Sequence, residues 1–465
     1  MKLTLEEISF ALKSVGDLNG SEKTVVTNVQ TDSRLVRQGD LFICLCGQKM
    51  DGHNFSGQAS RNGAAAIVSH HPMPSSGSPV LLVEDTLRAL GRLGRYWRMV
   101  KARKVIAVTG SAGKTITKEI LSDILGIDYQ VGKNYKNWNN QIGLPLSILK
   151  FSGDEDFWIL ELGINKPTDM DELGEIACPD LAVILNIGPC HLQGLGTLEG
   201  VAKSKAKILD HLQGPKKAFV CRDYALLEQE LKSRPHINPV WFSCSDNPAD
   251  YKVNYLKSGH YQVRDGEDSI QFKSVPGGEQ YCENIGAAWA VARQSGMAPV
   301  RIIEGLEKFS FPEQRFCVGS FGSWTIIDDT YNANPLSMIR AVNSARNLAG
   351  QRNLFLVVGD MGELGHTEAK AHQDLGREIS SVDCQGVFFQ GKNAENVRAG
   401  LDEQTRKHFH EILNPEHFRS ILDRLDYPGG VVLFKGSRNM GMERYVACFR
   451  EWNSGANDPE DCDKN

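Results

Sequence analysis

Long apolar runs are absent from this 465-residue sequence. No window approaches the 18 or so apolar residues that a membrane-spanning helix needs, and the first residues lack the apolar core of a signal peptide. We therefore expect a cytoplasmic protein with no membrane span.

An excess of positive charge is also absent. Lysine and arginine total 52 against 57 aspartate and glutamate, which gives a formal net charge of -5 at pH 7. A dedicated nucleic-acid binder usually carries a basic surface. We therefore expect small-molecule substrates as partners and no nucleic acid.

Closely paired cysteines are scarce. The eleven cysteines are dispersed, none forms a C-x-x-C motif, and Cys44 and Cys46 are the one close pair. An odd, dispersed count in a long chain is typical of reduced, packed thiols rather than of disulfides or a zinc site.

The length of the chain exceeds what one hydrophobic core supports and favours about three domains. Apolar runs alternate with helical patterns, which predicts an α/β protein built on parallel sheets. The expected divisions are a small α/β domain at 1–98, a central parallel-sheet domain at 99–314, a second parallel-sheet domain at 315–453 and a disordered acidic tail at 454–465.

A strand pattern, a glycine-containing turn and a helix pattern follow one another around residue 110. The glycines allow backbone N–H groups to approach phosphate oxygens, and the helix N-terminus adds a partial positive charge. A lysine and a threonine at the helix start suit the outer phosphates and a magnesium ion. The full P-loop pattern would place glycine at 108, where the sequence has Val108, and a plain strand-to-helix turn is the alternative. The predicted phosphate-binding loop consists of Gly110, Ser111, Ala112, Gly113, Lys114 and Thr115.

Two polar residues stand near the carboxyl ends of the next predicted strands. Glu161 interrupts the apolar run 156–163, and His191 lies just past the run 181–188. An unpaired carboxylate is costly inside a buried parallel strand, so such an acid usually faces a ligand or a metal ion. We expect Glu161 to be a magnesium ligand, with an ion pair to a nearby lysine as the alternative. For His191, a functional and a structural role stay equally open.

The sequence does not decide the role of two further segments. The turn Asp32-Ser33-Arg34 suits a phosphate or a sugar, or else a capped turn with a surface ion pair. The helix pattern 198–209 carries three lysines at alternate positions, which cannot share one face, and their spacing singles out none of them.

The C-terminal third repeats a strand-to-turn design. Apolar runs end in polar turns at 324–335 and 354–365, and two more strands are predicted at 386–391 and 431–438. Strands that alternate with helices indicate a second parallel sheet, with its strand-end loops along one edge.

Together these motifs resemble the Mur ligase family over roughly residues 25 to 445. The resemblance depends on the loop at 109–115, the Asn-rich segment 139–145, the histidine loop 188–192 and the segments 328–335 and 359–365. The last two segments are similar to the member that adds D-alanyl-D-alanine to UDP-N-acetylmuramoyl-tripeptide. The Asp-Asn-Pro-Arg tetrapeptide expected of the sibling that adds the third amino acid does not occur.

The resemblance implies three domains: a UDP-sugar-binding domain, a central P-loop ATPase domain and a C-terminal Rossmann-like domain. It also implies ATP, two Mg²⁺ ions and a carbamylated lysine at Lys205. Catalytic roles are implied for Lys114, His191, Lys205 and Arg315, and metal ligation for Thr115, Glu161, His191 and carbamylated Lys205. Further implied nucleotide contacts are Asn284, Arg315, Asp329, Tyr331 and Asn332. Implied substrate contacts are Asp32, Ser33, Arg34, Asn139, Asn140, Lys435, Ser437 and Arg438.

The implied reaction is ATP-dependent amide formation by a monomeric enzyme. ATP converts the peptide carboxylate into an acyl phosphate, and the amine of D-alanyl-D-alanine attacks it to give the pentapeptide, ADP and phosphate. Because an acyl phosphate is sensitive to water, we expect the third domain to close over the second. The motifs fit a tripeptide that ends in diaminopimelate or in lysine alike.

Two positions depart from the family pattern. Gln280-Tyr281 stands where the family commonly has His-Asn, and Gln314 precedes Arg315 where glycine is usual. These changes leave open a catalytically weak, nucleotide-binding scaffold in cell-wall assembly. A folate-glutamate or cyanophycin-type ligase is the second alternative. Retention of the loop lysine and of the implied metal ligands favours a working enzyme.

Overall fold

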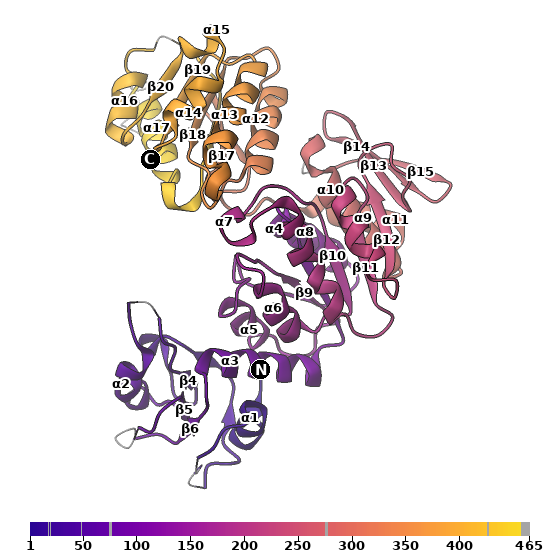
Figure 1. Cartoon of the computed structure of the whole chain (residues 1–465), viewed down its shortest axis with the longest axis vertical. Helices are drawn as coiled ribbons and strands as arrows, with labels where there is room; N and C mark the ends of the chain where they lie inside the picture. Colours follow the sequence, from indigo (N-terminus) through magenta and orange to yellow (C-terminus); the bar gives the residue numbers. More distant parts are fainter. Residues whose placement is uncertain are drawn as a thin grey trace, which may run out of the picture.

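The computed structural model describes residues 1–456 apart from 17, 19, 48, 74–76, 275–277 and 426. Three α/β units follow one another along the long axis of the molecule, with the first at one end and the C-terminal unit at the other (Figure 1). The last helix, α17 (Glu443–Ala456), continues into the predicted acidic tail, so residues 454–456 are helical. The rest of that tail lies outside the described residues.

The first unit is built on a small sheet of four parallel strands in the order β3-β4-β5-β6. Strands β4 and β6 coincide with the apolar runs at 41–45 and 80–83 of the sequence. The elements are β1 (Leu3–Thr4), α1 (Leu5–Leu12), β2 (Val25–Val26), β3 (Val29–Gln30), η1 (Ser33–Leu35), β4 (Leu41–Ile43), η2 (Gly52–Phe55), α2 (Ser56–Arg61), β5 (Ala66–Ser69) and β6 (Val80–Leu82).

Helix α3 (Thr86–Lys101) joins the first unit to the second. It packs on α1 of the first unit and on α5 (Gly143–Ile148) and α6 (Asp169–Ala177) of the second. The contact is close, because a Cβ on Gly94 would lie 2.8 Å from the Cβ of Pro145. The predicted boundary after residue 98 therefore divides a continuous helix that serves both units.

The central unit contains a nine-stranded sheet in the order β15-β14-β13-β12-β11-β10-β7-β9-β8. Strands β7 to β13 are parallel, as predicted, but β14 and β15 extend the sheet as antiparallel hairpins that the sequence reading missed. The strands are β7 (Lys104–Thr109), β8 (Val131–Lys133), β9 (Phe157–Glu161), β10 (Leu181–Ile184), β11 (Lys217–Cys221), β12 (Asn238–Ser243), β13 (Tyr251–Lys257), β14 (His260–Asp265) and β15 (Asp268–Lys273).

Helices cover both faces of the central sheet and enclose two apolar cores. One core is continuous with the first unit and includes Leu90 and Trp158, and the other contains Ile120 and Trp289. The remaining helices are α4 (Lys114–Leu125), α7 (Leu192–Leu195), α8 (Leu198–Ala206), η3 (Lys207–His211), α9 (Ala225–Lys232), η4 (Glu279–Tyr281), α10 (Cys282–Gln294) and α11 (Pro299–Lys308).

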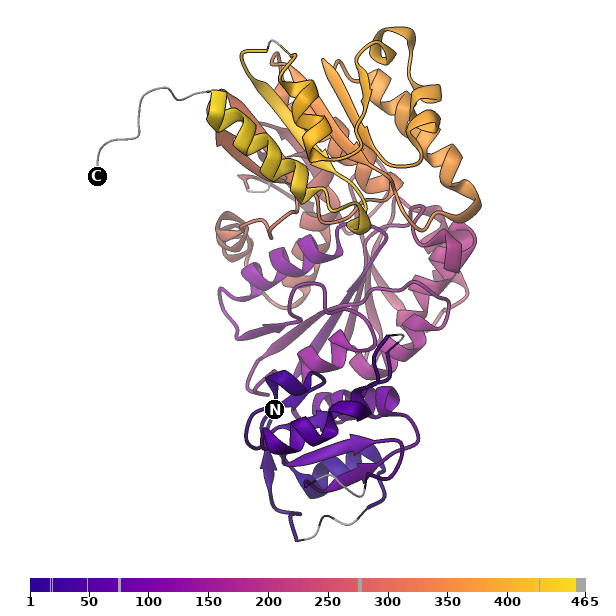
Figure 2. The same cartoon turned by 90° about the vertical axis from the view of Figure 1, so that its left-hand side faces the viewer.

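The C-terminal unit has six described strands in the order β16-β17-β21-β18-β19-β20, of which only β16 is antiparallel. This unit lies at the end of the molecule opposite the first unit (Figure 2). Its two faces hold separate cores, one around Leu375 and one around Phe418. The elements are β16 (Cys317–Phe321), β17 (Trp324–Asp329), α12 (Pro335–Ala349), β18 (Leu354–Gly359), η5 (Gly365–Thr367), α13 (Glu368–Ser381), β19 (Gly386–Gln390), α14 (Ala394–Gly400), α15 (Glu403–Arg406), β20 (Phe409–Glu411), α16 (Pro415–Leu422), β21 (Gly430–Lys435), η6 (Arg438–Met440) and α17.

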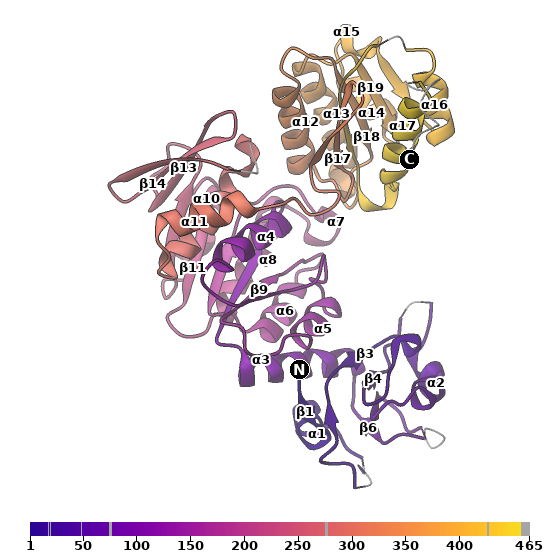
Figure 3. The ribbon, with the colours of Figure 1, turned by 180° about the vertical axis from the view of Figure 1, so that it is seen from behind.

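The central and C-terminal units meet at α7, which lies beside the C-terminal unit in the front and back views (Figures 1 and 3). The backbone N–H of Gln193 donates to the carbonyl of Glu363 at 3.1 Å. Among the described residues, no helix combines the length and the apolar character that crossing a membrane requires. The ten cysteines of the described part are free thiols, as their dispersed spacing predicts.

Candidate active site

A cavity of about 400 Å³ lies between the central and C-terminal units. Both sheets contribute the carboxyl ends of their strands to it, which is where open α/β sheets bind ligands. The residues predicted from sequence that line it are Ser111, Ala112, Gly113, Lys114, Thr115, Asn139, Asn140, Glu161, His191, Asn284, Arg315, Asp329, Tyr331, Asn332, Lys435 and Arg438. Those that do not line it are Asp32, Ser33, Arg34, Gly110, Lys205 and Ser437.

The predicted phosphate-binding loop connects β7 to α4. Gly113 has a φ of 80°, and a Cβ there would lie 2.5 Å from the amide nitrogen of Asn284, so only glycine fits. The side chain of Asn284 donates to the Gly113 carbonyl at 3.0 Å, and that of Asn186 accepts from the Ala112 N–H at 2.8 Å. These contacts hold the loop in one conformation. Val108 does not interrupt it, because β7 continues through residue 109.

Two lysines converge behind the loop. The ammonium groups of Lys114 and Lys205 donate to the same carbonyl, that of Gly110, at 2.8 and 3.0 Å. Neither forms an ion pair with a carboxylate within the described part of the chain. Burial lowers the pKa of Lys205 to about 8; the nearby thiol of Cys190 opposes this shift and Lys114 adds to it. Two cations without a carboxylate partner behind the loop favour the binding of an anion.

Glu161 lies at the end of β9, is almost fully buried and faces Thr115. The Thr115 hydroxyl donates to its carboxylate at 2.8 Å, and the Asn139 amide donates to the other oxygen at 2.7 Å. The alternative of a lysine partner is wrong, since these polar groups take both oxygens. A carboxylate and a hydroxyl so placed are the oxygen donors that Mg²⁺ prefers.

His191 links the central unit to the C-terminal unit. Its Nδ1 lies 2.5 Å from the carboxylate of Glu363. Glu363 belongs to the segment 359–365 but was not predicted to be a site residue. The hydrogen bond with His191 lowers the pKa of the Glu363 carboxyl. Both residues adopt positive φ, at 51° and 63°. Glu363 lies four residues past the end of β18, outside the apolar run, so the rule that selected Glu161 does not select it.

The C-terminal unit supplies an aromatic ring and charged groups to the cavity wall. The Arg315 guanidinium lies over the Tyr331 ring, 3.7 Å from its centroid, and donates to the Thr115 hydroxyl at 3.2 Å. Lys435 forms an ion pair with Asp329 at 2.6 Å. Burial raises the pKa of the Asp329 carboxyl, against the influence of Lys435. In this conformation Lys435 is neutralised by a neighbour, unlike the two lysines behind the loop.

Three side chains at the join were missed by the sequence reading. Asn334, the N-cap of α12, donates from its amide to the carbonyl of Ser111 at 3.0 Å. Arg340, nearly two helical turns further on, pairs with Glu283 of α10 at 2.6 Å. Asn334 before Pro335 has the pattern of a helix start. No local pattern predicts these contacts, because the partners belong to different units.

The remaining predicted residues have local partners. Asp32 caps η1 and pairs with the exposed Arg34 at 2.7 Å, as in the capped-turn interpretation, and the Ser33 hydroxyl donates to Gln58 at 2.8 Å. In the turn after β21, the Ser437 N–H donates to the carbonyl of Asp360 at 3.0 Å. Asn140 accepts from the N–H groups of residues 142 and 143, in addition to lining the cavity.

The two departures from the family pattern have definite places. Gln280 faces the cavity, and Tyr281 is buried against the ring of Phe311. Gln314 has a φ of 61°, a left-handed conformation that glycine adopts without strain. The glycine that the family usually has here suits this left-handed backbone, whereas Gln314 adopts it with conformational strain.

Comparison with known proteins defines the class of protein. Family models match three consecutive parts of the chain: the Mur ligase family catalytic domain at 25–98, the Mur ligase middle domain at 108–292 and the Mur ligase glutamate ligase domain at 314–438. The chain belongs to the Mur ligase family.

Relatives that match nearly the whole chain belong to one kind of Mur ligase. The chain is 33% identical over 459 residues to the UDP-N-acetylmuramoyl-tripeptide--D-alanyl-D-alanine ligase of Bacillus subtilis (strain 168), covering 96% of this chain and 98% of that protein. It superposes on MurF from Acinetobacter baumannii with a TM-score of 0.90 at 30% identity, covering 97% and 99% of the two chains. The MurF ligase of Thermotoga maritima, solved in complex with ADP, gives 0.82 at 30% identity over 93% and 99%.

Proposed function

We infer that this chain is an ATP-dependent carbon-nitrogen ligase that joins D-alanyl-D-alanine to UDP-N-acetylmuramoyl-tripeptide. The supporting observation is the phosphate-binding loop with Lys114, beside Glu161 and the buried amine of Lys205, in a chain that matches these ligases over 96% of its length. A folylpolyglutamate synthase shares only the fold, at 16% identity and a TM-score of 0.57. The product is UDP-N-acetylmuramoyl-pentapeptide, a precursor of peptidoglycan.

The loop residues bind the ATP phosphates through backbone N–H groups, and Lys114 neutralises the outer phosphate. Arg315, Tyr331, Asp329 and Asn332 face the nucleotide from the opposite wall. Asn284 acts differently, because its amide already donates to Gly113 and Thr117, so it supports the loop.

Magnesium ions fit the oxygen donors at one end of the loop. Thr115 and Glu161 would hold the first ion, with His191 and a carbamylated Lys205 at the second. When bound, these ions neutralise the charge of the transferring phosphoryl group. Carbamylation requires the neutral amine, and a pKa of about 8 leaves a substantial share of Lys205 in that form near neutral pH.

The chain itself positions the reactants and keeps charge balanced. The tripeptide carboxylate attacks the γ-phosphorus and releases ADP, since Lys114 and Arg315 stabilise the developing negative charge. The amine of D-alanyl-D-alanine then attacks the acyl carbon, and phosphate leaves when the tetrahedral intermediate collapses. The His191–Glu363 contact holds the two units together over the site, which limits the access of water.

The UDP end of the substrate binds at Asp32, Ser33 and Arg34 in the first unit. No residue that the structure describes in that unit lines the cavity, so the substrate extends from the first unit to the loop. Asn139 and Asn140 contact the substrate near the loop. Lys435, Ser437 and Arg438 lie nearest the incoming dipeptide. We propose that the enzyme acts as a monomer in the cytoplasm and becomes more compact when ATP and the UDP substrate bind.

Mass spectrometry of the product tests the assignment. Incubation with UDP-N-acetylmuramoyl-tripeptide, ATP and a panel of amines should yield the pentapeptide only with D-alanyl-D-alanine. A product formed only with glutamate or a single amino acid would keep the family and overturn the substrate. Nucleotide binding with no product would favour the scaffold.

A further inference from the structure

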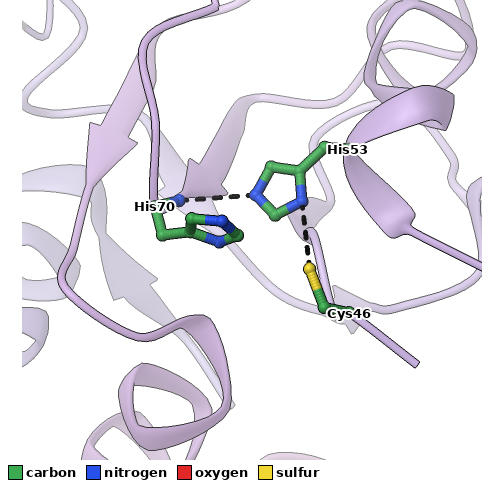
Figure 4. A group of neighbouring side chains, drawn as sticks. All are labelled: Cys46, His53 and His70. Carbon is green, nitrogen blue, oxygen red and sulfur yellow. Dashed lines mark hydrogen bonds between the residues drawn. The ribbon is translucent and has the colours of Figure 1, made fainter. Parts of the chain in front are cut away.

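A second group of chemically reactive side chains lies in the first unit, at the carboxyl edge of its sheet. Cys46 follows β4, His70 follows β5, and His53 lies in η2 between them (Figure 4). One ligand atom from each of the three residues lies within 4.8 Å of the others. Strands β4 and β5 are hydrogen-bonded neighbours, so the sheet itself brings the two loops together.

The spacing of the donor atoms suits a tetrahedral metal ion. The Sγ of Cys46 lies 3.7 Å from the Nδ1 of His53. Ordinary Zn–S and Zn–N bond lengths place a sulfur and a nitrogen about 3.6 Å apart across one tetrahedral zinc ion. The rings of His53 and His70 are 4.2 Å apart between centroids, which keeps the third donor within reach.

Asp51 completes the surroundings of the group. Its Oδ1 lies 2.6 Å from the Nδ1 of His53 and accepts from the Cys46 thiol at 3.3 Å. It also accepts from the backbone N–H of His53. A carboxylate therefore stands beside both donors. One thiolate and one carboxylate together balance the charge of a divalent ion.

We propose that Cys46, His53 and His70 bind a Zn²⁺ ion, whose bond to the His53 Nδ1 replaces the hydrogen bond between that nitrogen and Asp51. Thiolate and imidazole ligands select zinc over Mg²⁺, which prefers oxygen. On binding, the Cys46 thiol loses its proton to solvent. The ring proton of His53 moves from Nδ1, which contacts Asp51, to Nε2, which gives up the bond it accepts from the His70 backbone N–H at 3.4 Å. The odd, dispersed cysteine count and the lack of a C-x-x-C motif favoured no zinc site. The proposed ligands lie 7 and 17 residues apart, so they form no such motif.

The ion would join the loop after β4 to the loop after β5. The turn Asp32-Ser33-Arg34 follows β3, the next strand of the same parallel sheet, so it lies on the same edge. Zinc would thus fix the loops beside that turn. The zinc proposal itself rests only on the donor group and holds whatever the first unit binds.

Cobalt(II) is the direct probe, because a cobalt–thiolate bond gives a charge-transfer absorption that oxygen and nitrogen ligands do not. Full-length protein without a polyhistidine tag, in excess Mg²⁺ to occupy oxygen sites, should develop that band up to one equivalent of Co²⁺. Cys46→Ser should abolish the band, and Cys448→Ser, a half-buried cysteine far along the sequence, should retain it. Absence of the band in the parent, or its survival in Cys46→Ser, would overturn the proposal.

Competition with a chromophoric chelator then measures the affinity for Zn²⁺. Loss of a group behind a ligand already weakens metal binding 10–100-fold, so removal of a ligand should weaken it by at least about 100-fold. We expect this for Cys46→Ser and for His70→Ala, both exposed positions where the fold should survive, and no change for the exposed His408→Ala. Unchanged affinity in His70→Ala would refute the assigned ligand set. Binding should also release about one proton per zinc at pH 7, from the thiol.

Discussion

Arg340 and Glu283 join the C-terminal unit to the central unit through an ion pair that water barely reaches. The Glu283 carboxylate accepts two bonds from Arg340, at 2.6 and 3.0 Å, and further bonds from the Tyr224 hydroxyl at 2.6 Å and the Asn186 amide at 2.7 Å. Burial opposes the charge on Arg340, but Glu283 more than offsets it, and the pKa of the guanidinium is raised.

Arg340→Met should therefore loosen the join between the units. Breaking a fully buried pair costs about 3–5 kcal/mol. The Arg340 side chain is 26% exposed and Glu283 keeps two neutral donors, so we expect about 2 kcal/mol. That is roughly a 30-fold shift toward separated units. Because the two contacts that remain to Glu283 lie inside the central unit, the units should part before either unfolds.

Small-angle X-ray scattering of the unliganded protein measures this opening as a larger radius of gyration. Arg346→Met is the matched control, since Arg346 lies on the same helix and its bonds stay within the C-terminal unit. A double-mutant cycle with Glu283→Gln should give a coupling of at least about 1 kcal/mol. An unchanged radius in Arg340→Met, or a coupling near zero, would refute the account of the join.

Three further predictions concern the site itself. The neutral fraction of Lys205 rises as the pH passes its pKa of about 8. A carbamate signal in ¹³C NMR with labelled bicarbonate should therefore grow over that pH range. Growth only above pH 10, or a signal that persists in Lys205→Ala, would contradict the assignment. Glu161→Gln keeps the size of the side chain but removes the charge, so the Mg²⁺-dependent rate should fall by about 100-fold or more while nucleotide still binds without metal; a near-parental rate would exclude Glu161 as a ligand. Gln314→Gly should raise the free energy of unfolding by about 0.5–1 kcal/mol because glycine relieves the left-handed backbone, whereas Gln314→Ala should not; equal effects in thermal denaturation would disprove the strain.

The parts of the site that the sequence predicted are those with a local signal. The loop at 110–115 follows from one strand, one turn and one helix start. Glu161 was found because an acid inside an apolar run needs a partner. The same logic located His191 and the strand-to-turn segments of the C-terminal unit, since parallel strands bring their carboxyl ends to one edge.

The parts that the sequence did not predict depend on contacts between distant segments. Lys205 reaches the carbonyl of Gly110 across 95 residues, and Glu363 reaches His191 across 172. Nothing in the spacing of the three lysines near 205 distinguishes the buried one from its exposed neighbours. The strands β14 and β15 were not predicted because they are half-exposed hairpin strands rather than continuous apolar runs.

Phosphate release from ATP tests the ligase most directly. Release should require both UDP-N-acetylmuramoyl-tripeptide and D-alanyl-D-alanine, and it should fall by at least about 100-fold in Lys114→Ala because the outer phosphate loses its counter-charge. Lys203→Ala, an exposed lysine two positions before Lys205, should behave like the parent protein. Release that needs neither substrate, or that persists in Lys114→Ala, would contradict the account.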